Sequence, residues 1–313
     1  MAAINNELNY INQMAREDPQ DMIGRSEARY RNIVGAIADR ALRAQGHKLI
    51  LLAGPSASGK TTSAKKIAGA LKTAGVNTFY VSMDDFYLPA ERIPLLPNGK
   101  RDIESVHALD LPLLRRTLRE LMETGQGTLP RFDFATGTSR EGITLKLGPE
   151  DMIVLEGLHA LHPLLAEQLS GMHPAQLTKV YVSVSSRIYN EKEIVLNKRG
   201  IRLARRMLRD CQFRGTLPEL TLGMWSAVTQ GEEQYLAPCK PFADVFINSI
   251  HIYECCVYRA RLLPLLNAIP EDSPVYGKGQ KLARALERFE PLDGDLVPKD
   301  SLLREFLGTS GRS

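Results

Sequence analysis

Residues 49–61 read LILLAGPSASGKT, a short apolar run followed by a glycine-rich loop that ends in lysine and threonine. A continuous apolar run of this length is typical of a buried strand in a parallel sheet. The loop matches G-x-x-x-x-G-K-[ST] at every fixed position, and a helix is predicted to begin at Lys60. This order predicts a phosphate-binding loop, because backbone N–H groups curl around an anion at the positive end of the helix.

The same loop predicts which residues bind the nucleotide. In such loops the lysine, here Lys60, reaches the β- and γ-phosphates, and the hydroxyl of Thr61 is a ligand of Mg²⁺. We therefore expect ATP and Mg²⁺ as cofactors. The motif alone leaves a kinase, a GTPase, an ATPase motor and a nucleotide-dependent transferase open. The predicted nucleotide-binding residues are Gly54, Pro55, Ser56, Ala57, Ser58, Gly59, Lys60, Thr61 and Thr62.

Further apolar runs and helical patterns alternate along the chain. Helices are predicted from Ser26 to a stop at Gly46, over 61–71, and from the cap Asp110 through Leu121. Strands that alternate with helices predict an α/β fold of the P-loop NTPase class, with a parallel sheet covered by helices on both faces. The further strands are predicted at 78–83, 152–155, 180–184 and 245–247.

Composition narrows the class of protein. With 43% hydrophobic and 24% charged residues, the chain has the make-up of a soluble globular protein. Its start lacks the basic and apolar regions of a signal peptide, and no stretch approaches the roughly 18 apolar residues of a membrane span. We therefore expect a cytoplasmic protein without membrane contact. Its four cysteines form no CxxC pair, so neither a zinc site nor a disulfide framework is expected.

Acidic residues stand where predicted strands end. Asp84 and Asp85 follow one strand, Glu156 follows another, and Glu104 lies in the loop before the helix capped by Asp110. Ligands collect beyond the carboxyl ends of parallel strands, where an acid can hold magnesium or accept a hydroxyl proton. A local structural cap is the alternative for Asp85. A structural role is harder to assign to Glu156, because a carboxylate after four apolar residues needs a partner or a metal.

Basic charge is concentrated between Lys198 and Arg214, where seven basic residues face the single acid Asp210, although the whole chain has a net charge of only +4. We expect a mobile helix that lowers guanidinium groups onto a triphosphate. The alternatives are a solvated basic face with acid partners elsewhere, and a nucleic-acid surface, which the lack of interleaved aromatic residues disfavours. Four of the arginines share one helix face at spacing i, i+3, i+4, i+7, namely Arg202, Arg205, Arg206 and Arg209.

These motifs in this order resemble the uridine kinase family of P-loop kinases, relatives of phosphoribulokinase and type I pantothenate kinase. The resemblance covers about residues 48–215, and the later segments MWSAVTQGEEQYLAPCKPFADVFINS and DSLLREFLG look like a bacterial branch of nucleoside kinase-like proteins. The matching strings are GPSASGKTT, SMDDFY, ESVHALD, RFDF, VLEG and RRMLRDCQFRG.

The resemblance implies an ATP-dependent kinase, most often acting on the 5′-hydroxyl of a nucleoside, and it implies a role for each matching residue. Asp84 would take the proton from that hydroxyl, and Glu104 would grip the ribose hydroxyls. Glu156 would complete a magnesium environment with Thr61 and Asp84. The further substrate contacts would be Tyr87, Phe132 and Arg206, and the lid residues on the phosphates would be Arg209 and Arg214.

The patterns along the chain, together with the resemblance, predict a division of the chain into three regions. Residues 1–46 would form an N-terminal arm and helix, in which 1–24 are a loose arm or a short helix. Residues 47–270 would form the P-loop kinase domain, with an arginine-bearing lid helix at about 198–216. Residues 271–313, rich in turn residues, would form a C-terminal wrapping tail.

The acceptor is left open by one departure from the family pattern. Pyrimidine kinases place a tyrosine and then a histidine against the base, whereas this chain has Phe132 followed by residues 135–138, which read ATGT. Phe132 can stack on a base, but this loop offers no histidine, so another nucleoside, a phosphorylatable sugar, or a phosphoribulokinase- or pantothenate kinase-like acceptor remains open. The chain's six histidines receive no role, and capping or solvent exposure is expected for His159 and His162.

Two other classes of protein compete with a kinase. A regulatory nucleotide switch would hydrolyse slowly and bind a partner, but a GTPase would need an NKxD motif, and the nearest string, NKRG at 197–200, lacks the acid. A nucleic-acid ATPase would bind RNA or DNA with an affinity that falls steeply with salt. We expect a small-molecule partner and no nucleic acid, and a homo-oligomer stays open.

Overall fold

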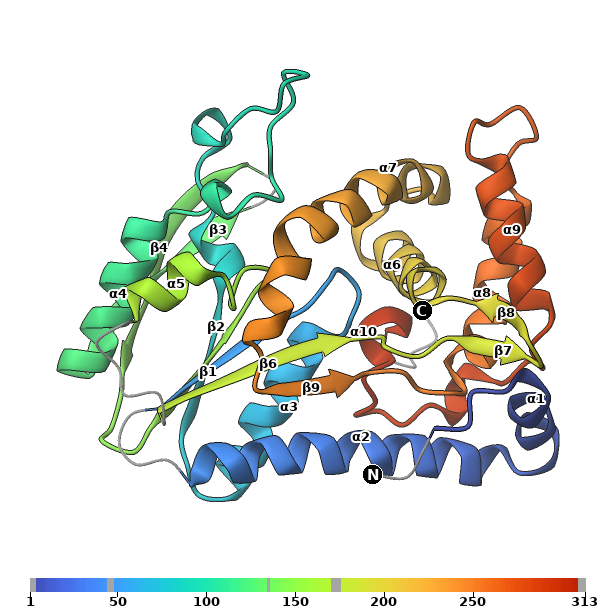
Figure 1. Cartoon of the computed structure of the whole chain (residues 1–313), viewed down its shortest axis with the longest axis horizontal. Helices are drawn as coiled ribbons and strands as arrows, with labels where there is room; N and C mark the ends of the chain where they lie inside the picture. Colours follow the sequence, from blue (N-terminus) through green and yellow to red (C-terminus); the bar gives the residue numbers. More distant parts are fainter. Residues whose placement is uncertain (1–3, 44–47, 134–135, 170–175, 309–313) are drawn as a thin grey trace.

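A five-stranded parallel sheet forms the centre of the molecule, with the strand before the glycine-rich loop in its middle (Figure 1). The computed structural model describes residues 4–43, 48–133, 136–169 and 176–308. The strand order is β2-β5-β1-β6-β9, and every neighbouring pair is parallel, which confirms the predicted fold class. The strands are β1 (Lys48–Ala53), β2 (Thr78–Ser82), β5 (Met152–Glu156), β6 (Leu177–Ser183) and β9 (Val245–Asn248).

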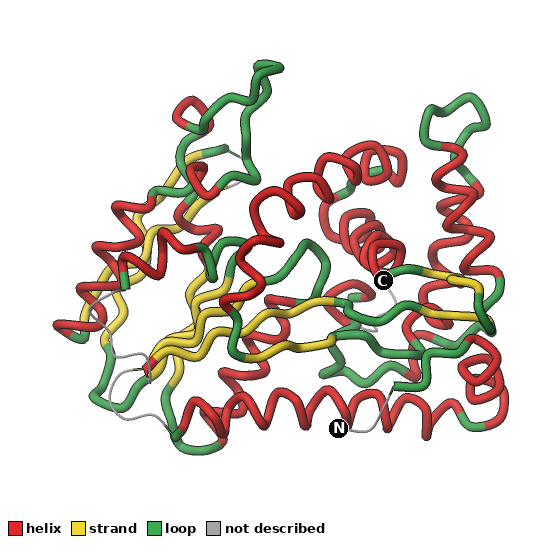
Figure 2. Tube along the Cα trace, viewed as in Figure 1, coloured by secondary structure: helices red, strands yellow, loops and turns green. Residues whose placement is uncertain are grey.

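Helices cover both faces of this sheet (Figure 2). Alternate residues of β1 point to opposite faces: Leu49 and Leu51 pack with α4 and α5, whereas Ile50 and Leu52 pack in the larger core on the other side. The helices of the smaller core are α4 (Leu111–Thr124) and α5 (Pro163–Gln168). The larger core is built from α2 (Pro19–Leu42), α3 (Lys60–Thr73), α6 (Lys198–Arg214), α7 (Pro218–Gly231), α8 (Glu254–Asn267) and α9 (Tyr276–Glu287).

Two antiparallel ribbons lie outside the central sheet, and neither was predicted. The first pairs β3 (Gln126–Asp133) with β4 (Thr138–Lys146), and the second pairs β7 (Ile188–Asn190) with β8 (Glu193–Leu196). Pro130 and many polar residues hide β3, because proline is excluded from central strands but tolerated at an edge or a bulge. The pairing register shifts between Leu129 and Arg131, beside this proline.

The described N-terminal residues, from residue 4 on, form two helices, so the short-helix alternative is the correct one for them. Helix α1 (Leu8–Glu17) buries Leu8 and Ile11, and α2 begins at Pro19, seven residues before the predicted start at Ser26. The side chain of Asp18 caps α2 by accepting a hydrogen bond of 3.0 Å from the N–H of Asp21. Gly46, the predicted end of this helix, lies outside the described residues.

The C-terminal residues reach the centre of the molecule. The short helix α10 (Arg304–Leu307) packs on α6, and it lies between α3 and α6 (Figure 1). Leu302, Leu303 and Phe306 are fully buried. The last described turn of the chain therefore borders the glycine-rich loop, while the division into three domain regions remains a prediction.

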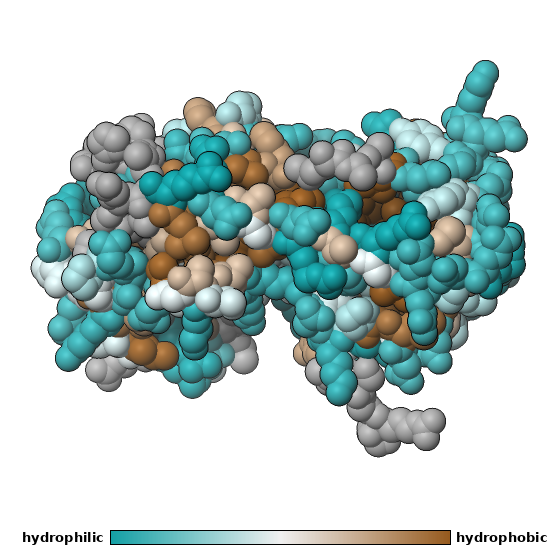
Figure 3. Space-filling model, turned by 90° about the horizontal axis from the view of Figure 1, so that it is seen from below, coloured by the Kyte–Doolittle hydropathy of each residue, from teal (hydrophilic) through white to brown (hydrophobic). Residues whose placement is uncertain are grey.

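No helix in the described ranges is both long enough and apolar enough to span a bilayer. On the face seen from below in Figure 3, hydrophobic residues lie in patches interrupted by hydrophilic ones. That surface therefore carries no continuous apolar band.

Candidate active site

The glycine-rich loop joins β1 to α3, and its conformation is imposed by its neighbours. A Cβ atom on Gly54 would lie 2.1 Å from the carbonyl oxygen of Val182, so only glycine fits there. Gly59 stands before α3 with φ +85°, a conformation that glycine adopts without cost. Ala57 has φ +56°, which costs a residue with a side chain about 1–2 kcal/mol. The surrounding structure must therefore hold the loop in its curl.

Two arginines of α6 supply part of that hold. Arg202 donates to the carbonyl oxygen of Ser56 at 3.0 Å, and Arg205 donates to those of Ala57 and Ser58, both at 3.4 Å. The hydroxyl of Ser249 also donates to the carbonyl of Ser58, at 2.6 Å. These bonds hold three loop carbonyls toward α6 and Ser249.

Arg202 and Arg205 also have buried acid partners. This corrects the prediction that all four arginines on one face of this helix are directed at a triphosphate. Arg202 makes two hydrogen bonds of 2.7 Å to Glu232, and Arg205 makes bonds of 2.6 and 2.9 Å to Glu254. All four side chains are buried, so each cation meets the anion that burial demands. The partners lie 30 and 49 positions further along the chain, beyond the reach of helical spacing.

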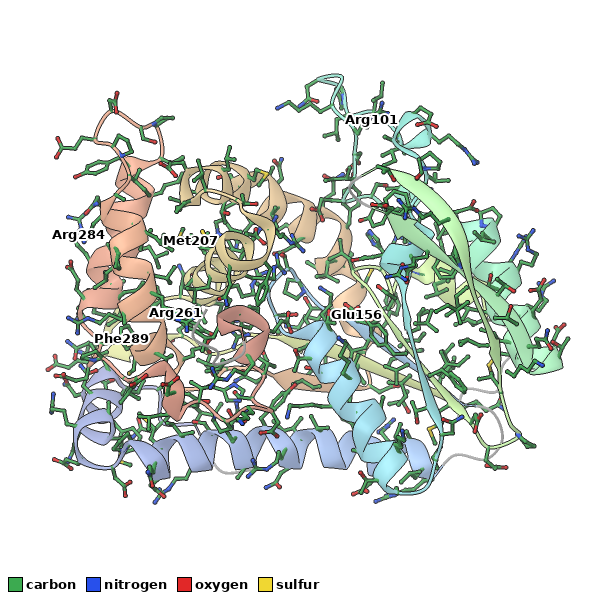
Figure 4. The ribbon with its side chains drawn as sticks, turned by 180° about the vertical axis from the view of Figure 1, so that it is seen from behind. Arg101, Glu156, Met207, Arg261, Arg284 and Phe289 are labelled. Carbon is green, nitrogen blue, oxygen red and sulfur yellow. The ribbon has the colours of Figure 1, made fainter. Side chains whose placement is uncertain are left out.

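In this conformation α6 is a packed helix and not a loosely attached lid. Its residues Ile201, Ala204 and Met207 are fully buried, and Figure 4 labels Met207 on this helix. The expected mobility of this helix therefore has no counterpart in the observed packing.

Three further arginines of α6 gather around one buried acid. Arg206, Arg209 and Arg214 approach Asp210 at 3.2, 2.9 and 3.4 Å. Arg206 also donates to the hydroxyl of Ser56 at 2.8 Å. Burial, followed by the charge of Arg209, lowers the pKa of Arg214. Three cations share one carboxylate, so positive charge remains to attract an anion.

These arginines face a cleft of about 780 Å³ at the glycine-rich loop. Its lining comes from seven separate segments of the chain, and five of these segments supply most of the predicted site residues. Its lining residues are Ser56, Ala57, Ser58, Gly59, Lys60, Thr61, Asp84, Tyr87, Glu104, Glu156, Leu158, Arg206, Arg209, Arg214, Glu232 and Glu305.

Four of the predicted site residues do not line the cleft themselves. Gly54 and Pro55 form the start of the loop, and Thr62 follows it in α3. The ring of Phe132 lies 5.9 Å from that of Tyr87, centroid to centroid, so it backs a residue that does line the cleft. Gly137, in the loop where the base-reading histidine is missing, has a left-handed φ of +68°.

Three of the carboxylates that line the cleft were predicted from the sequence, and desolvation by the surrounding protein raises the pKa of each. Glu156 ends β5 beside the start of α3 (Figure 4) and accepts a hydrogen bond of 2.9 Å from the hydroxyl of Tyr80. The side chain of Asp84 is exposed to the cleft. The surrounding protein still removes water from its carboxyl group, which raises the pKa of that group, and the charge of Lys60 partly offsets this effect. Burial and then Glu232 raise the pKa of Glu104. Raised pKa values suit groups that accept protons near neutral pH.

Asp85 makes a structural contact, but not the local cap that was the alternative interpretation. Its carboxylate accepts a hydrogen bond of 3.3 Å from the N–H of Phe132. The partner lies in β3 and not in a local turn, so Asp85 ties the hairpin to the turn that carries Asp84.

Sequence reasoning missed two further acids of the cleft. Glu232 begins a π-helical turn (Glu232–Leu236) and accepts a hydrogen bond of 2.8 Å from the N–H of Ser56. Glu305 of α10 accepts bonds of 2.5 and 3.3 Å from the hydroxyl and the N–H of Thr62. Glu305 stands 243 positions after Thr62, and no motif links them.

His159 was also misjudged, because it is neither a cap nor exposed. It is 2% exposed, and its Nε2 lies 2.9 Å from the carbonyl oxygen of Glu104. Burial lowers its pKa to about 4. His162 does act as a cap, since its Nδ1 accepts a hydrogen bond from the N–H of Leu164. His47 and His173 lie outside the described residues.

Comparison with known proteins gives one family match and several relatives. The family model described as Phosphoribulokinase / Uridine kinase family matches residues 49–254. Curated uridine kinases from Lactobacillus johnsonii and Clostridium botulinum are 28% and 27% identical over 200 residues, 64% of this chain and 85% and 86% of theirs. A solved structure described as a possible uridine kinase from Bacillus stearothermophilus is 21% identical, with a TM-score of 0.45, and the match covers 69% of this chain and 98% of that one. The family match includes the glycine-rich loop and α6 but not Glu305.

Proposed function

This chain belongs to the phosphoribulokinase / uridine kinase family, and on that premise we propose that it transfers the γ-phosphoryl group of ATP to the 5′-hydroxyl of a nucleoside. Family membership makes the chain a kinase, that is, a phosphotransferase. One observation carries the finer proposal: the glycine-rich loop, three arginines and Asp84 line a single cleft.

The loop side of the cleft fits a triphosphate. The helix start at Lys60 and the side chains of Arg206, Arg209 and Arg214 direct positive charge to one place. Transfer of a phosphoryl group depends mostly on such positioning and on neutralising charge. We assign Lys60, Arg209 and Arg214 to the phosphates on this basis.

The oxygen donors in the cleft fit Mg²⁺. Thr61, Asp84 and Glu156 are hard oxygen donors at the phosphate loop, and this ion is typically bound by one or two carboxylates together with substrate phosphates. When bound, the ion would neutralise charge on the β- and γ-phosphates. Within the described chain, no three histidine, cysteine or acidic side chains form a metal site by themselves, so a phosphate-supported ion is the form that fits.

Asp84 is our candidate for the general base. Its carboxylate would take the proton of the acceptor hydroxyl while the hydroxyl oxygen bonds to the γ-phosphorus and ADP leaves. Asp84 lines the same cleft as Lys60 and the glycine-rich loop, which supports this role.

The charge of the acceptor side favours an uncharged, hydroxylated acceptor. Burial, followed by the charges of Asp84 and Glu104, raises the pKa of Tyr87, so these three groups lie close together. Arg206 offsets only part of the effect on Glu104. A phosphate or carboxylate on the acceptor would be repelled here, as like charges across an interface are. Tyr87 and Phe132 add aromatic surface for a base.

A coupled ADP-release assay tests the proposal. It compares uridine, cytidine, adenosine, guanosine, ribulose 5-phosphate, pantothenate and a sample without acceptor. We expect release that depends on a nucleoside. Release only without acceptor would favour a regulatory NTPase, and release with ribulose 5-phosphate or pantothenate would contradict the charge argument.

A further inference from the structure

The loop that carries Glu104 is fixed from behind at three points. We call residues 102–104 the acceptor loop. The hydroxyl of Tyr235 donates to the carboxylate of Asp102, and the ring of His159 bonds to the carbonyl of Glu104. A Cβ atom on Gly231 would lie 2.9 Å from the Cβ of Glu104, so the backbone of α7 closes the third side. The loop has no regular secondary structure of its own. Two further hydrogen bonds hold its backbone: the hydroxyl of Tyr87 donates to the carbonyl of Ile103 at 3.1 Å, and the N–H of Asp102 donates to the carbonyl of Pro94 at 2.7 Å.

The surroundings of His159 define which nitrogen carries the proton. A carbonyl oxygen only accepts, so Nε2 carries hydrogen and donates to Glu104. Nδ1 is buried and has no hydrogen-bond partner among the described residues. The rings of His162 and Tyr235 lie edge-on at 5.9 and 6.5 Å. His159 is therefore a neutral donor enclosed by aromatic groups, and its one hydrogen bond goes to the acceptor loop.

We propose that His159 is a positioning residue that fixes the carboxylate of Glu104 for the acceptor and so sets acceptor affinity. The inference rests on the proposed function, because Glu104 contacts the acceptor only in that assignment. The carbonyl and the carboxylate belong to one residue, so a shift of the first moves the second. Displacements of about 1 Å in a positioned group can cost up to about a hundredfold in rate. The ATP side has no direct bond to His159 among the described residues.

The first test compares two substitutions of His159 using the nucleoside with the fastest ADP release. His159→Leu removes the donor and keeps an apolar side chain, whereas His159→Gln keeps an N–H near the position of Nε2. We expect His159→Leu to raise the acceptor KM about tenfold with the ATP KM unchanged, as loss of one positioning hydrogen bond would. His159→Gln should recover most of that loss. His107→Leu is the matched control, because His107 is an exposed histidine three residues after Glu104.

A double-mutant cycle with Glu104→Ala decides whether His159 acts through Glu104. If it does, His159→Leu should change the acceptor KM less than about twofold once Glu104 is truncated, because coupled residues are non-additive. An equal effect in both backgrounds would overturn the inference and leave the proposed function intact. So would a large effect of Glu104→Ala beside none of His159→Leu. A Glu104→Ala enzyme with normal acceptor KM would also overturn the inference, whereas the proposed function fails only if ADP release does not depend on a nucleoside. Thermal unfolding of each variant excludes losses caused by misfolding.

Discussion

The two sides of the cleft are built in opposite ways. On the phosphate side, Arg202 and Arg205 bind loop carbonyls from a packed helix, and Glu232 binds the loop from within the cleft wall. On the acceptor side, short turns, the loop around Glu104 and an edge hairpin carry the candidate residues, and Arg101 lies far out on the neighbouring loop (Figure 4). Loops placed on a rigid scaffold commonly carry specificity. The difference indicates that the fold holds the phosphate-binding residues more firmly than the residues proposed to select the acceptor.

Asp84 stands where the two sides meet, and its loss should have the largest effect. Asp84→Asn keeps the size of the side chain but cannot take a proton. We expect turnover to fall by about 10²–10⁴, the usual contribution of a general base, while the Kd for ATP stays within about twofold. Single-turnover kinetics and calorimetric titration with ATP measure the two quantities. Turnover close to that of the parent enzyme would remove Asp84 from the role of base.

The arginines of α6 should differ in role: we expect Arg205 to stabilise the fold and Arg209 to support turnover. Arg205→Met leaves Glu254 buried without its cation, so we expect a loss of about 3–5 kcal/mol in the free energy of unfolding. Arg209→Met, four positions on, should cost clearly less stability than Arg205→Met, because Asp210 keeps Arg206 and Arg214 as partners. It should lower turnover, because this side chain borders the cleft. Urea denaturation and steady-state kinetics report these effects. Equal stability losses for the two variants would contradict the division.

The phosphate side was also the more predictable one. The loop, its strand and its helix are contiguous, and Asp84 and Glu156 follow apolar strands, so local patterns located them. The acid partners Glu232 and Glu254 come from segments 30 and 49 positions away, and spacing on one helix carries no sign of them. Without those partners, the sequence favoured guanidinium groups directed at a triphosphate, whereas Arg202 and Arg205 form two buried ion pairs. The alternative with acid partners elsewhere was correct for these two arginines, although they are buried and not solvated.

The acceptor side was predicted less completely for a physical reason. Its hairpin is an edge ribbon with Pro130 and polar residues, so it lacks the apolar pattern that reveals a central strand. The contact between His159 and Glu104 joins a ring to a backbone carbonyl, and any residue supplies such a carbonyl. No pattern of residue types could therefore predict this contact.

A substitution of Phe132 tests whether the acceptor-binding surface extends beyond Tyr87. Phe132→Ala removes a ring that packs on Tyr87, and aromatic pairs of this kind contribute about 0.5–1.5 kcal/mol. We expect the acceptor KM to rise about two- to tenfold, with Phe132→Tyr close to the parent and the ATP KM unchanged in both. If initial-rate measurements show no change for Phe132→Ala, the acceptor contacts end at Tyr87.

Glu305 should give the smallest effect, and its sign makes it informative. Its carboxylate occupies the hydroxyl and N–H of Thr62 at the start of α3, where a nucleotide phosphate would seek the same donors. Glu305→Gln keeps an acceptor oxygen for Thr62 but removes the negative charge. A charge at a helix start is worth about 0.3–1 kcal/mol, so we expect the Kd for ATP to fall about two- to fivefold.

Inorganic tripolyphosphate should show the same factor, because the base takes no part. Asp300→Asn is the control, since it removes a charge of the same C-terminal segment that pairs with Lys66 away from the cleft lining. Weaker binding of both ligands to Glu305→Gln would instead make Glu305 a support of the phosphate side, tying the C-terminal turn to the loop as a further fixed contact.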